Sequence, residues 1–275
     1  MSATDPLAAL LAPSPPSAEK LKGCCAAAYS HPAVRWLLGG ELHPGGEETT
    51  RRALGMIDLR PGQRLLDVAS GAGTSALLAA REFGAWVVGV DYGEAAVREA
   101  CEAASEAGLA GRVGFVYGDA EELPLADASF DAVLCECSLC TFPDKPRAVA
   151  EIRRVLRPGG RLALSDVIVE ASLPAPLRGA AATVACVGEA LSRSGYEELL
   201  AYAGLRVEAV ESRQAETDRF ARRIEERLRG ARLLGAGELV AAPLGVEKGI
   251  EAVRSAREAI VAGTLGYMTF ALARA

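Results

Sequence analysis

The sequence predicts an α/β fold in which helices cover both faces of a parallel sheet. Two observations support this prediction. A short apolar segment, residues 65–68, leads through a glycine-containing turn into a helical pattern that begins at Thr74. The same order then repeats as far as Asp166, with short apolar segments alternating with helical ones. Strands joined by single helices run parallel, and the helices pack on the two faces of their sheet.

The residues before the first strand are expected to form a tail and a helical cap. Residues 1–17 are rich in Ala, Pro and Ser. Prolines oppose a helix and little apolar surface is available there, so we expect a flexible tail. Helical patterns follow, with Pro32 placed to start a helix and a further helix over 47–57. We therefore assign residues 18–58 to an N-terminal helical cap and residues 59–275 to the α/β domain.

The later elements follow from the same alternation. The helix over 147–156 is expected to be closed by Pro158-Gly159-Gly160, and the charges at helical spacing over 217–228 indicate a solvated helix face. A helical insertion at about 172–204 would cover the ligand-binding edge of the sheet and supply substrate contacts. The expected strands are residues 65–68, 87–90, 113–116, 130–134, 161–165, 205–210 and 267–272, and the further helices are residues 93–107, 147–156, 177–190, 196–203, 217–228 and 246–261.

Charge and composition argue against several classes of protein. The 275 residues carry a net charge of −6, which disfavours nucleic acid or an anionic membrane as the main partner. Seven cysteines without a secretory signal fit the reducing cytoplasm better than a disulfide framework. The longest uncharged run, residues 259–273, is shorter than the roughly 18 residues of a membrane-spanning helix. We expect a cytoplasmic protein with a small-molecule substrate.

The turn after the first strand is typical of a nucleotide cofactor loop. Gly71 and Gly73 let the backbone approach a ligand, and the following helix start presents unpaired N–H groups. With Ala76 the turn also satisfies the relaxed dinucleotide pattern G-x-G-x-x-A, so alone it permits a nicotinamide cofactor. Asp67, inside the strand, is costly to bury unless it pairs with a cation or N–H groups. A positively charged amino group on the cofactor is one such partner.

Further carboxylates follow the next strands. Asp91 ends the second strand, where its carboxylate can accept both hydroxyls of a ribose, and Asp119 follows the third, where it can meet an adenine amine. Phe130-Asp131-Ala132-Val133 then leads the fourth strand, and Arg154-Val155-Leu156-Arg157-Pro158-Gly159-Gly160 precedes the fifth.

This ordered set resembles the class I S-adenosylmethionine-dependent methyltransferases over about residues 65–166, with weaker likeness onward to the seventh strand. The resemblance implies a Rossmann-like, seven-stranded sheet whose last strand is antiparallel, and S-adenosylmethionine as the cofactor. Thr74 is explained equally well as a helix cap. Tyr92 can stack on adenine or cover the strand end, and for Asp67 a hydrogen bond to the glycine loop is the less favoured alternative. The implied cofactor-binding residues are Asp67, Ser70, Gly71, Gly73, Thr74, Asp91, Tyr92, Asp119, Ala120, Cys135 and Glu136.

The cysteines allow three explanations. Cys137 and its neighbours follow the fourth strand in Cys135-Glu136-Cys137-Ser138-Leu139-Cys140, Cys186 lies in the helical insertion, and Cys24-Cys25 lies in the cap. They are small buried hydrophobic residues, ligands of a structural zinc ion, or a thiolate cradle, meaning a set of cysteine thiolates that bind a soft electrophilic substrate. Zinc is disfavoured because the C-x-C-x-x-C spacing is unusual and no histidine is near, so no resident metal is expected. Cys101, among helical alanines, is expected in the core.

A closer likeness favours the thiolate cradle. Residues 137–145, CSLCTFPDK, and residues 185–190, ACVGEA, are similar to the corresponding segments of arsenite methyltransferases. This similarity implies Cys137 and Cys186 as ligands of trivalent arsenic, with Cys25 more loosely as a third. Two departures stand against it, because no cysteine lies between Cys25 and the glycine loop and residues 31–46 do not match.

The sequence therefore predicts an S-adenosylmethionine-dependent methyltransferase and leaves its acceptor open. An arsenic lone pair needs no general base, so Cys137, Cys186 and Cys25 would act by holding and orienting the acceptor. The alternative acceptor is an oxygen, nitrogen or carbon of a small organic molecule, with Glu136 or His43 as the base. The explanation of His43 as an ordinary loop histidine is favoured over a role as the base. A protein that binds the cofactor or a metalloid without catalysis is the alternative from another class.

Overall fold

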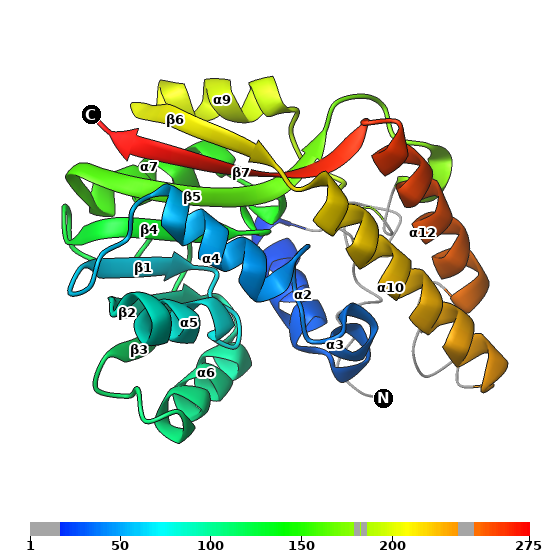
Figure 1. The fold of residues 1–275 in the computed structure, drawn as a ribbon, viewed down its shortest axis with the longest axis horizontal. Coiled ribbons are helices and arrows are strands. Elements are labelled where there is room, and N and C mark those ends of the chain that lie inside the picture. The colour runs from blue at the N-terminus through cyan, green and yellow to red at the C-terminus, as the bar shows by residue number, and fades with distance from the viewer. Residues whose placement is uncertain (1–16, 179–181, 183–185, 236–244) are drawn as a thin grey trace.

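The computed structural model describes residues 17–178, 182, 186–235 and 245–275, and contains a seven-stranded sheet of order β3-β2-β1-β4-β5-β7-β6 (Figure 1). Strand β7 is antiparallel to β5 and β6, and the other pairings are parallel. The predicted Rossmann-like sheet with an antiparallel last strand is thereby confirmed. The strands are β1 (Arg64–Val68), β2 (Trp86–Asp91), β3 (Val113–Tyr117), β4 (Phe130–Glu136), β5 (Leu156–Val169), β6 (Leu205–Ser212) and β7 (Leu265–Arg274).

Helices cover both faces of the sheet. One apolar cluster joins α4, α5 and α6 to one face, and a second joins α7 and α9 to the other. Residues 65–68 of β1 are all buried, as expected for a central strand covered on both sides. The helices are α2 (Ala18–Ser30), α3 (Pro32–Leu38), α4 (Gly46–Met56), α5 (Thr74–Phe83), α6 (Glu94–Glu106), α7 (Lys145–Val155), α9 (Arg193–Tyr202), α10 (Gln214–Leu233) and α12 (Val246–Val261), with short 3₁₀ turns at Leu139–Thr141 and Ala175–Leu177.

Helices α2 and α3 of the N-terminal cap lie at the carboxyl ends of the parallel strands, between the sheet and α10 (Figure 1), whereas α4 packs on the sheet face covered by α5 and α6. Ser17 caps α2, its hydroxyl accepting a hydrogen bond from the Lys20 N–H. The cap is tied to α10 because Arg223 pairs with Glu41 and Arg227 donates to the Leu37 carbonyl at 3.1 Å. The predicted tail falls on residues 1–16, outside the described residues.

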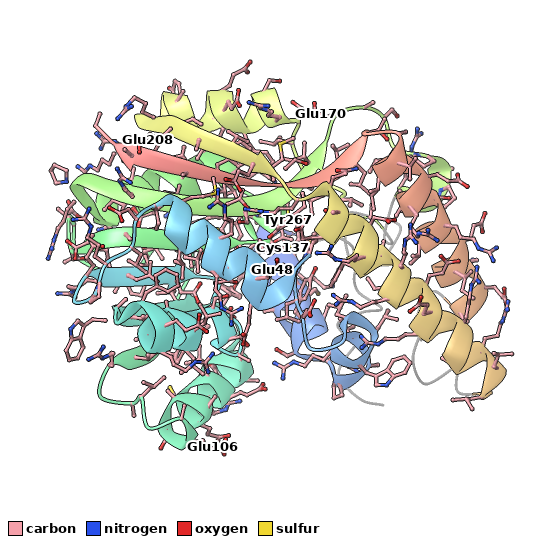
Figure 2. The ribbon with its side chains drawn as sticks, viewed as in Figure 1. Glu48, Glu106, Cys137, Glu170, Glu208 and Tyr267 are labelled. Atoms are coloured by element: carbon pink, nitrogen blue, oxygen red, sulfur yellow. The ribbon has the colours of Figure 1, made fainter. Side chains whose placement is uncertain are left out.

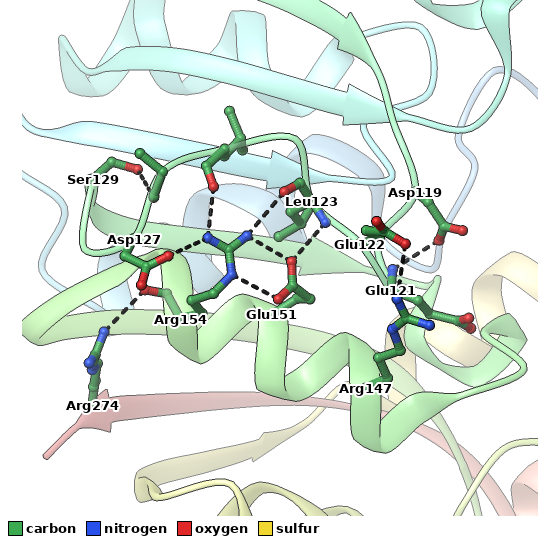
Figure 3. A network of polar contacts seen from close by, with 12 residues as sticks. Asp119, Glu121, Glu122, Leu123, Asp127, Ser129, Arg147, Glu151, Arg154 and Arg274 are labelled. Atoms are coloured by element: carbon green, nitrogen blue, oxygen red, sulfur yellow. Dashed lines mark hydrogen bonds and ion pairs between the residues drawn. The ribbon is translucent and has the colours of Figure 1, made fainter.

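The loop after β3 is fastened to α7 by Arg154 and by Arg147, which pairs with Glu122 at 2.9 Å (Figure 3). The Arg154 guanidinium pairs with Asp127 at 2.6 Å and Glu151 at 2.7 Å, and donates to the carbonyls of Leu123 and Leu125. This network holds the loop that carries Asp119 against α7.

Two expected element bounds are corrected. Strand β5 begins at Leu156, directly after α7, so Pro158-Gly159-Gly160 lies inside the strand instead of between helix and strand. Leu156 pairs with Phe130, and the register then shifts before Ala132, which accommodates the turn-like residues at the strand's start. The helix expected over 177–190 does not include its expected ends, because Leu177 ends a 3₁₀ turn and residues 186–190 are not helical. Ala182 is helical, and residues 179–181 and 183–185 lie outside the described residues.

The charged face of α10 is not fully solvated, contrary to expectation. Glu225 is only 4% exposed and pairs with Arg229 of its own helix and with Arg254 and Arg257 of α12. These ion pairs join the two helices, which lie side by side in Figure 1.

Cys101 is exposed, so its expected place in the core is wrong. Helix α6 buries Ala96, Ala100 and Ala104, which recur every four residues and define its inner face. Cys101 follows Ala100 and therefore points away from that face. In the described part of the chain, no helix is both long and apolar enough to cross a membrane.

Candidate active site

A cleft lies at the carboxyl ends of β1, β2, β3 and β4, under the cap. It encloses about 1000 Å³ of empty space, part of it open to solvent, which is the size of many cofactor and small-molecule sites. Eight predicted site residues line it: Cys25, Gly71, Asp91, Tyr92, Asp119, Ala120, Glu136 and Cys137. The others, Asp67, Ser70, Gly73, Thr74, Cys135 and Cys186, are not in its lining.

The two glycines of the first turn have different roles. Gly71 has φ of +53° and lines the cleft, and its N–H donates to Asp91 at 2.8 Å. Gly73 has φ of +83°, and a Cβ there would lie 2.5 Å from the Phe115 ring. Gly73 is therefore required by packing and by its left-handed backbone, whereas Gly71 is open to a ligand.

Thr74 does not reach the site. It is exposed, and α5 has Gly73 as its N-cap with no side-chain cap hydrogen bond. Neither explanation of Thr74, as a cap or as a cofactor contact, is supported by its position.

Asp91 joins the two loops that border the nucleotide end of the cleft. One carboxylate oxygen accepts the Gly71 N–H and the other accepts the Gly93 N–H at 2.7 Å. Burial raises the pKa of Asp91, and these two backbone hydrogen bonds oppose the rise. Each carboxylate oxygen keeps a further lone pair, so the residue fits a ribose diol. Tyr92 also lines this end, with its ring 5.7 Å from that of Tyr117.

Asp67 is a buried acid that lacks a cation. It is 3% exposed, and one of its carboxylate oxygens has no hydrogen-bond partner among the described residues. Burial raises its pKa well above the usual value, and the carboxylates of Glu136 and Asp91 raise it further. Asp67 also accepts a hydrogen bond from the Ala76 N–H, which opposes this rise, and it lies outside the lining of the cleft. A ligand ammonium group that reached Asp67 would satisfy the oxygen and relieve the repulsion. The residues present therefore fit a cationic amino-acid cofactor.

Glu136 and His43 meet at the far end of the cleft. The imidazole Nε2 of His43 lies 3.6 Å from a Glu136 oxygen. Glu136 is also fixed by hydrogen bonds from Ser75 at 2.8 Å and Thr50 at 3.0 Å. The His43 ring stacks on Tyr267, and its Nδ1 is buried without a hydrogen-bond partner in the described part of the chain.

The sequence prediction missed Ser75 and Thr50. They lie on α5 and α4, and no spacing in the sequence relates either of them to Glu136.

Cys137 and Cys186 come together, as the arsenite resemblance implied. The Cys186 sulfur is hydrogen-bonded to the thiols of Cys137 and Cys140 and lies 2.6 Å from the Tyr29 hydroxyl oxygen. These bonds lower the pKa of Cys186 and favour its thiolate. Both Cys137 and Cys186 have positive φ, 51° and 58°, which is rare outside glycine and common at functional sites. Figure 2 places Cys137 near Tyr267, at the centre of the molecule.

The remaining cysteines are divided between the cleft and the core. Cys25 lines the cleft beside Tyr29, and burial raises its pKa to about 12. Cys24 and Cys135 are buried, and the Cys135 sulfur contacts the Ser138 hydroxyl at 3.2 Å. Among the described residues, no group of three or more His, Cys, Asp or Glu side chains is placed to hold a metal ion.

Comparisons with known proteins indicate the family of the chain. A family model described as a methyltransferase domain matches residues 59–204. The 27-O-demethylrifamycin SV methyltransferase of Amycolatopsis mediterranei (strain S699) is 39% identical over 229 residues, covering 78% of this chain and 84% of that protein. The arsenite methyltransferase of Halobacterium salinarum is 40% identical over 118 residues, which cover 42% of this chain and 30% of that protein.

Among solved structures, that of the [4+2]-cyclase SpnF superimposes with a TM-score of 0.77 and 25% identity, over 94% of this chain and 97% of the other.

Proposed function

Because the chain belongs to the class I S-adenosylmethionine-dependent methyltransferases, we propose that it methylates a hydroxyl oxygen of a small organic molecule. The enzyme class and the cofactor, S-adenosylmethionine, follow from the family and replace the nicotinamide and non-catalytic alternatives. The acceptor is the part that we propose. A hydroxyl must lose its proton as its oxygen is methylated, so such an enzyme gains from a base beside the acceptor.

The cleft supports a definite orientation of the cofactor. Asp91 would receive the ribose and Asp119 the adenine amine, which places the nucleotide under α2. Asp67 and Glu136 would lie toward the methionine end, where two carboxylates favour a cationic ligand. When bound, S-adenosylmethionine supplies an electrophilic methyl group.

The pair formed by His43 and Glu136 is the observation on which the proposal rests. With Nε2 facing Glu136 and Thr50, the neutral ring would carry its proton on Nε2 and leave Nδ1 free to accept one. The His43 ring lines the cleft, and its buried Nδ1, once the acceptor reaches it, would take the proton of the acceptor hydroxyl. The Glu136 carboxylate would stabilise the imidazolium that forms. Ser75 and Thr50 keep Glu136 in place for this role.

The relatives support an oxygen acceptor. The rifamycin relative is named for methylation at an oxygen, and the nocamycin O-methyltransferase of Saccharothrix syringae is 38% identical over 148 residues, 52% of each chain. These names belong to those proteins, and they support the same class of acceptor here.

The test is a pair of histidine variants. His43→Asn should lower methyl transfer to a panel of phenols, enols and secondary alcohols by about 10²-fold, measured as S-adenosylhomocysteine release. His31→Asn is the matched control, because His31 is exposed and asparagine preserves its role as the N-cap of α3. Calorimetry should show unchanged cofactor binding in both variants. Full activity of His43→Asn would exclude His43 as the base.

A thiophilic acceptor such as trivalent arsenic is the second candidate. The contact between Cys137 and Cys186 favours it, as does the similarity to an arsenite methyltransferase over the matched segment. On this proposal the double variant Cys137→Ser/Cys186→Ser loses arsenite-dependent methyl transfer, while Cys101→Ser, an exposed cysteine, retains it. An arsenite activity that survives in the double variant would end this proposal.

A further inference from the structure

The cap reaches the nucleotide end of the cleft through Lys22 of α2. Its ammonium lies 2.8 Å from a carboxylate oxygen of Asp119 and also donates to Glu121. The Lys22 side chain is 14% exposed, and that of Glu121 8%. Burial lowers the pKa of Lys22, but the hydrogen bonds that its ammonium donates to Asp119 and Glu121 outweigh burial and raise the pKa overall.

This contact fixes the Asp119 carboxylate. One of its oxygens accepts the Glu121 N–H at 2.9 Å and the other accepts the Lys22 ammonium. Glu121 is itself held, because its second oxygen accepts the Asp144 N–H at 2.7 Å. Both Lys22 and Asp119 line the cleft.

The two sides of the contact differ in how firmly they are anchored. Asp119 belongs to the loop that Arg154 fastens to α7 (Figure 3). The cap is attached elsewhere by Arg35, which pairs with Glu99 of α6 at 2.5 Å, and by the contacts of Glu41 and Leu37 with α10. Attachment of the cap therefore does not depend on Lys22, and a lysine that buries its charge against two acids calls for another role.

We propose that Lys22 is a cofactor-positioning residue, which orients the Asp119 carboxylate and closes α2 over the adenosine end of bound S-adenosylmethionine. The proposal concerns cofactor binding and does not depend on which acceptor is methylated. The proposal assumes that Asp119 binds the adenine amine. The experiment below tests the role of Lys22 and the role of Asp119 separately.

The test compares three lysine variants by calorimetry with S-adenosylmethionine, S-adenosylhomocysteine and methylthioadenosine. Lys22→Met should raise the Kd of all three by a similar factor, about tenfold, because they share the adenosine. Lys22→Arg should restore most of the affinity. Lys20→Met, on an exposed residue of the same helix, should bind like the wild type. Binding of Lys22→Met within twofold of the wild type, or a loss that spares methylthioadenosine, would overturn the proposal.

A double-mutant cycle distinguishes positioning from general damage to the fold. If Lys22 acts through Asp119, then Lys22→Met/Asp119→Asn should bind no more weakly than Asp119→Asn alone. Fully additive losses contradict the coupling, whereas an Asp119→Asn variant with normal affinity would contradict the role of Asp119 itself. The melting temperature of each variant is measured first. The titrations are then run at a temperature at which every variant is folded.

Discussion

The imidazole of His43 lies 3.6 Å from the carboxylate of Glu136, although one residue belongs to the N-terminal cap and the other ends β4. A pair of this kind combines a nitrogen that can accept a proton with a carboxylate that stabilises the resulting charge. It is formed only when the cap is seated over the carboxyl edge of the sheet. The cap is thus part of the candidate active site as well as its cover.

The first prediction concerns Glu136. Glu136→Gln keeps the side-chain size but removes the charge that would stabilise protonated His43, so kcat should fall by about 10²-fold. The Kd of S-adenosylmethionine, measured separately by calorimetry, tells whether cofactor binding changes as well. Glu122→Gln, at a carboxylate that is 80% exposed, is the control. An unchanged kcat in Glu136→Gln would contradict the role of the pair.

The second prediction concerns the charge of Asp67. Its pKa is raised by burial and by the carboxylates of Glu136 and Asp91, so the folded protein binds a proton there that the unfolded chain releases above about pH 4. Asp67 therefore costs stability as the pH rises, and Asp67→Asn should raise the melting temperature of the cofactor-free protein at neutral pH. The same variant should bind S-adenosylmethionine more weakly, because it loses the partner of the ammonium.

Proton release provides a second measurement on Asp67. A bound ammonium should lower its pKa, so cofactor binding should release protons from the wild type and not from Asp67→Asn. Calorimetry in buffers with different ionisation enthalpies detects this release. Equal binding enthalpies in all buffers for the wild type would count against an ammonium at Asp67.

The third prediction separates two costs at Gly73. Gly73→Ala must adopt a φ of +83° and place its Cβ 2.5 Å from the Phe115 ring. Gly108 has a φ of +68° with nothing within 4 Å, so Gly108→Ala measures the backbone cost alone, about 1–2 kcal/mol. Overpacking against Phe115 should add about 1–3 kcal/mol in Gly73→Ala. Urea unfolding gives the free energy of unfolding of both variants. Equal losses in Gly73→Ala and Gly108→Ala would show that the Phe115 ring moves aside without cost.

The fourth prediction concerns the pairing of α10 with α12. Bonds from Arg257, Arg254 and Arg229 lower the pKa of Glu225. A lowered carboxyl pKa contributes stability above the unfolded value, about pH 4.3, and that stability is lost as the pH falls through the folded value. Glu225→Gln should therefore be less stable than the wild type at pH 7, and the difference should shrink below pH 4. Glu226→Gln, one position along the helix, is the control.

The sequence predicted local structure well, because strands, turns and helices depend on neighbouring residues. The glycine turn at Gly71, the strand that ends at Asp91 and the succession of seven strands along the chain all follow from patterns within short segments or from the resemblance that these motifs carry. Expectations that depended on packing were less secure. Cys101 was expected in the core because its neighbours are alanines, but the inner face of α6 is set by the sheet beneath it.

By itself, the sequence determined the α/β architecture and a cofactor loop followed by carboxylates at successive strand ends. Only the tertiary structure decided that His43 meets Glu136 and that Lys22 meets Asp119, whereas the resemblance to arsenite methyltransferases had already implied that Cys186 meets Cys137. Each of these pairs joins segments far apart in the chain. Periodicity and turn chemistry act over a few residues, whereas the pairing of distant side chains depends on how the cap and the insertion pack against the edge of the sheet.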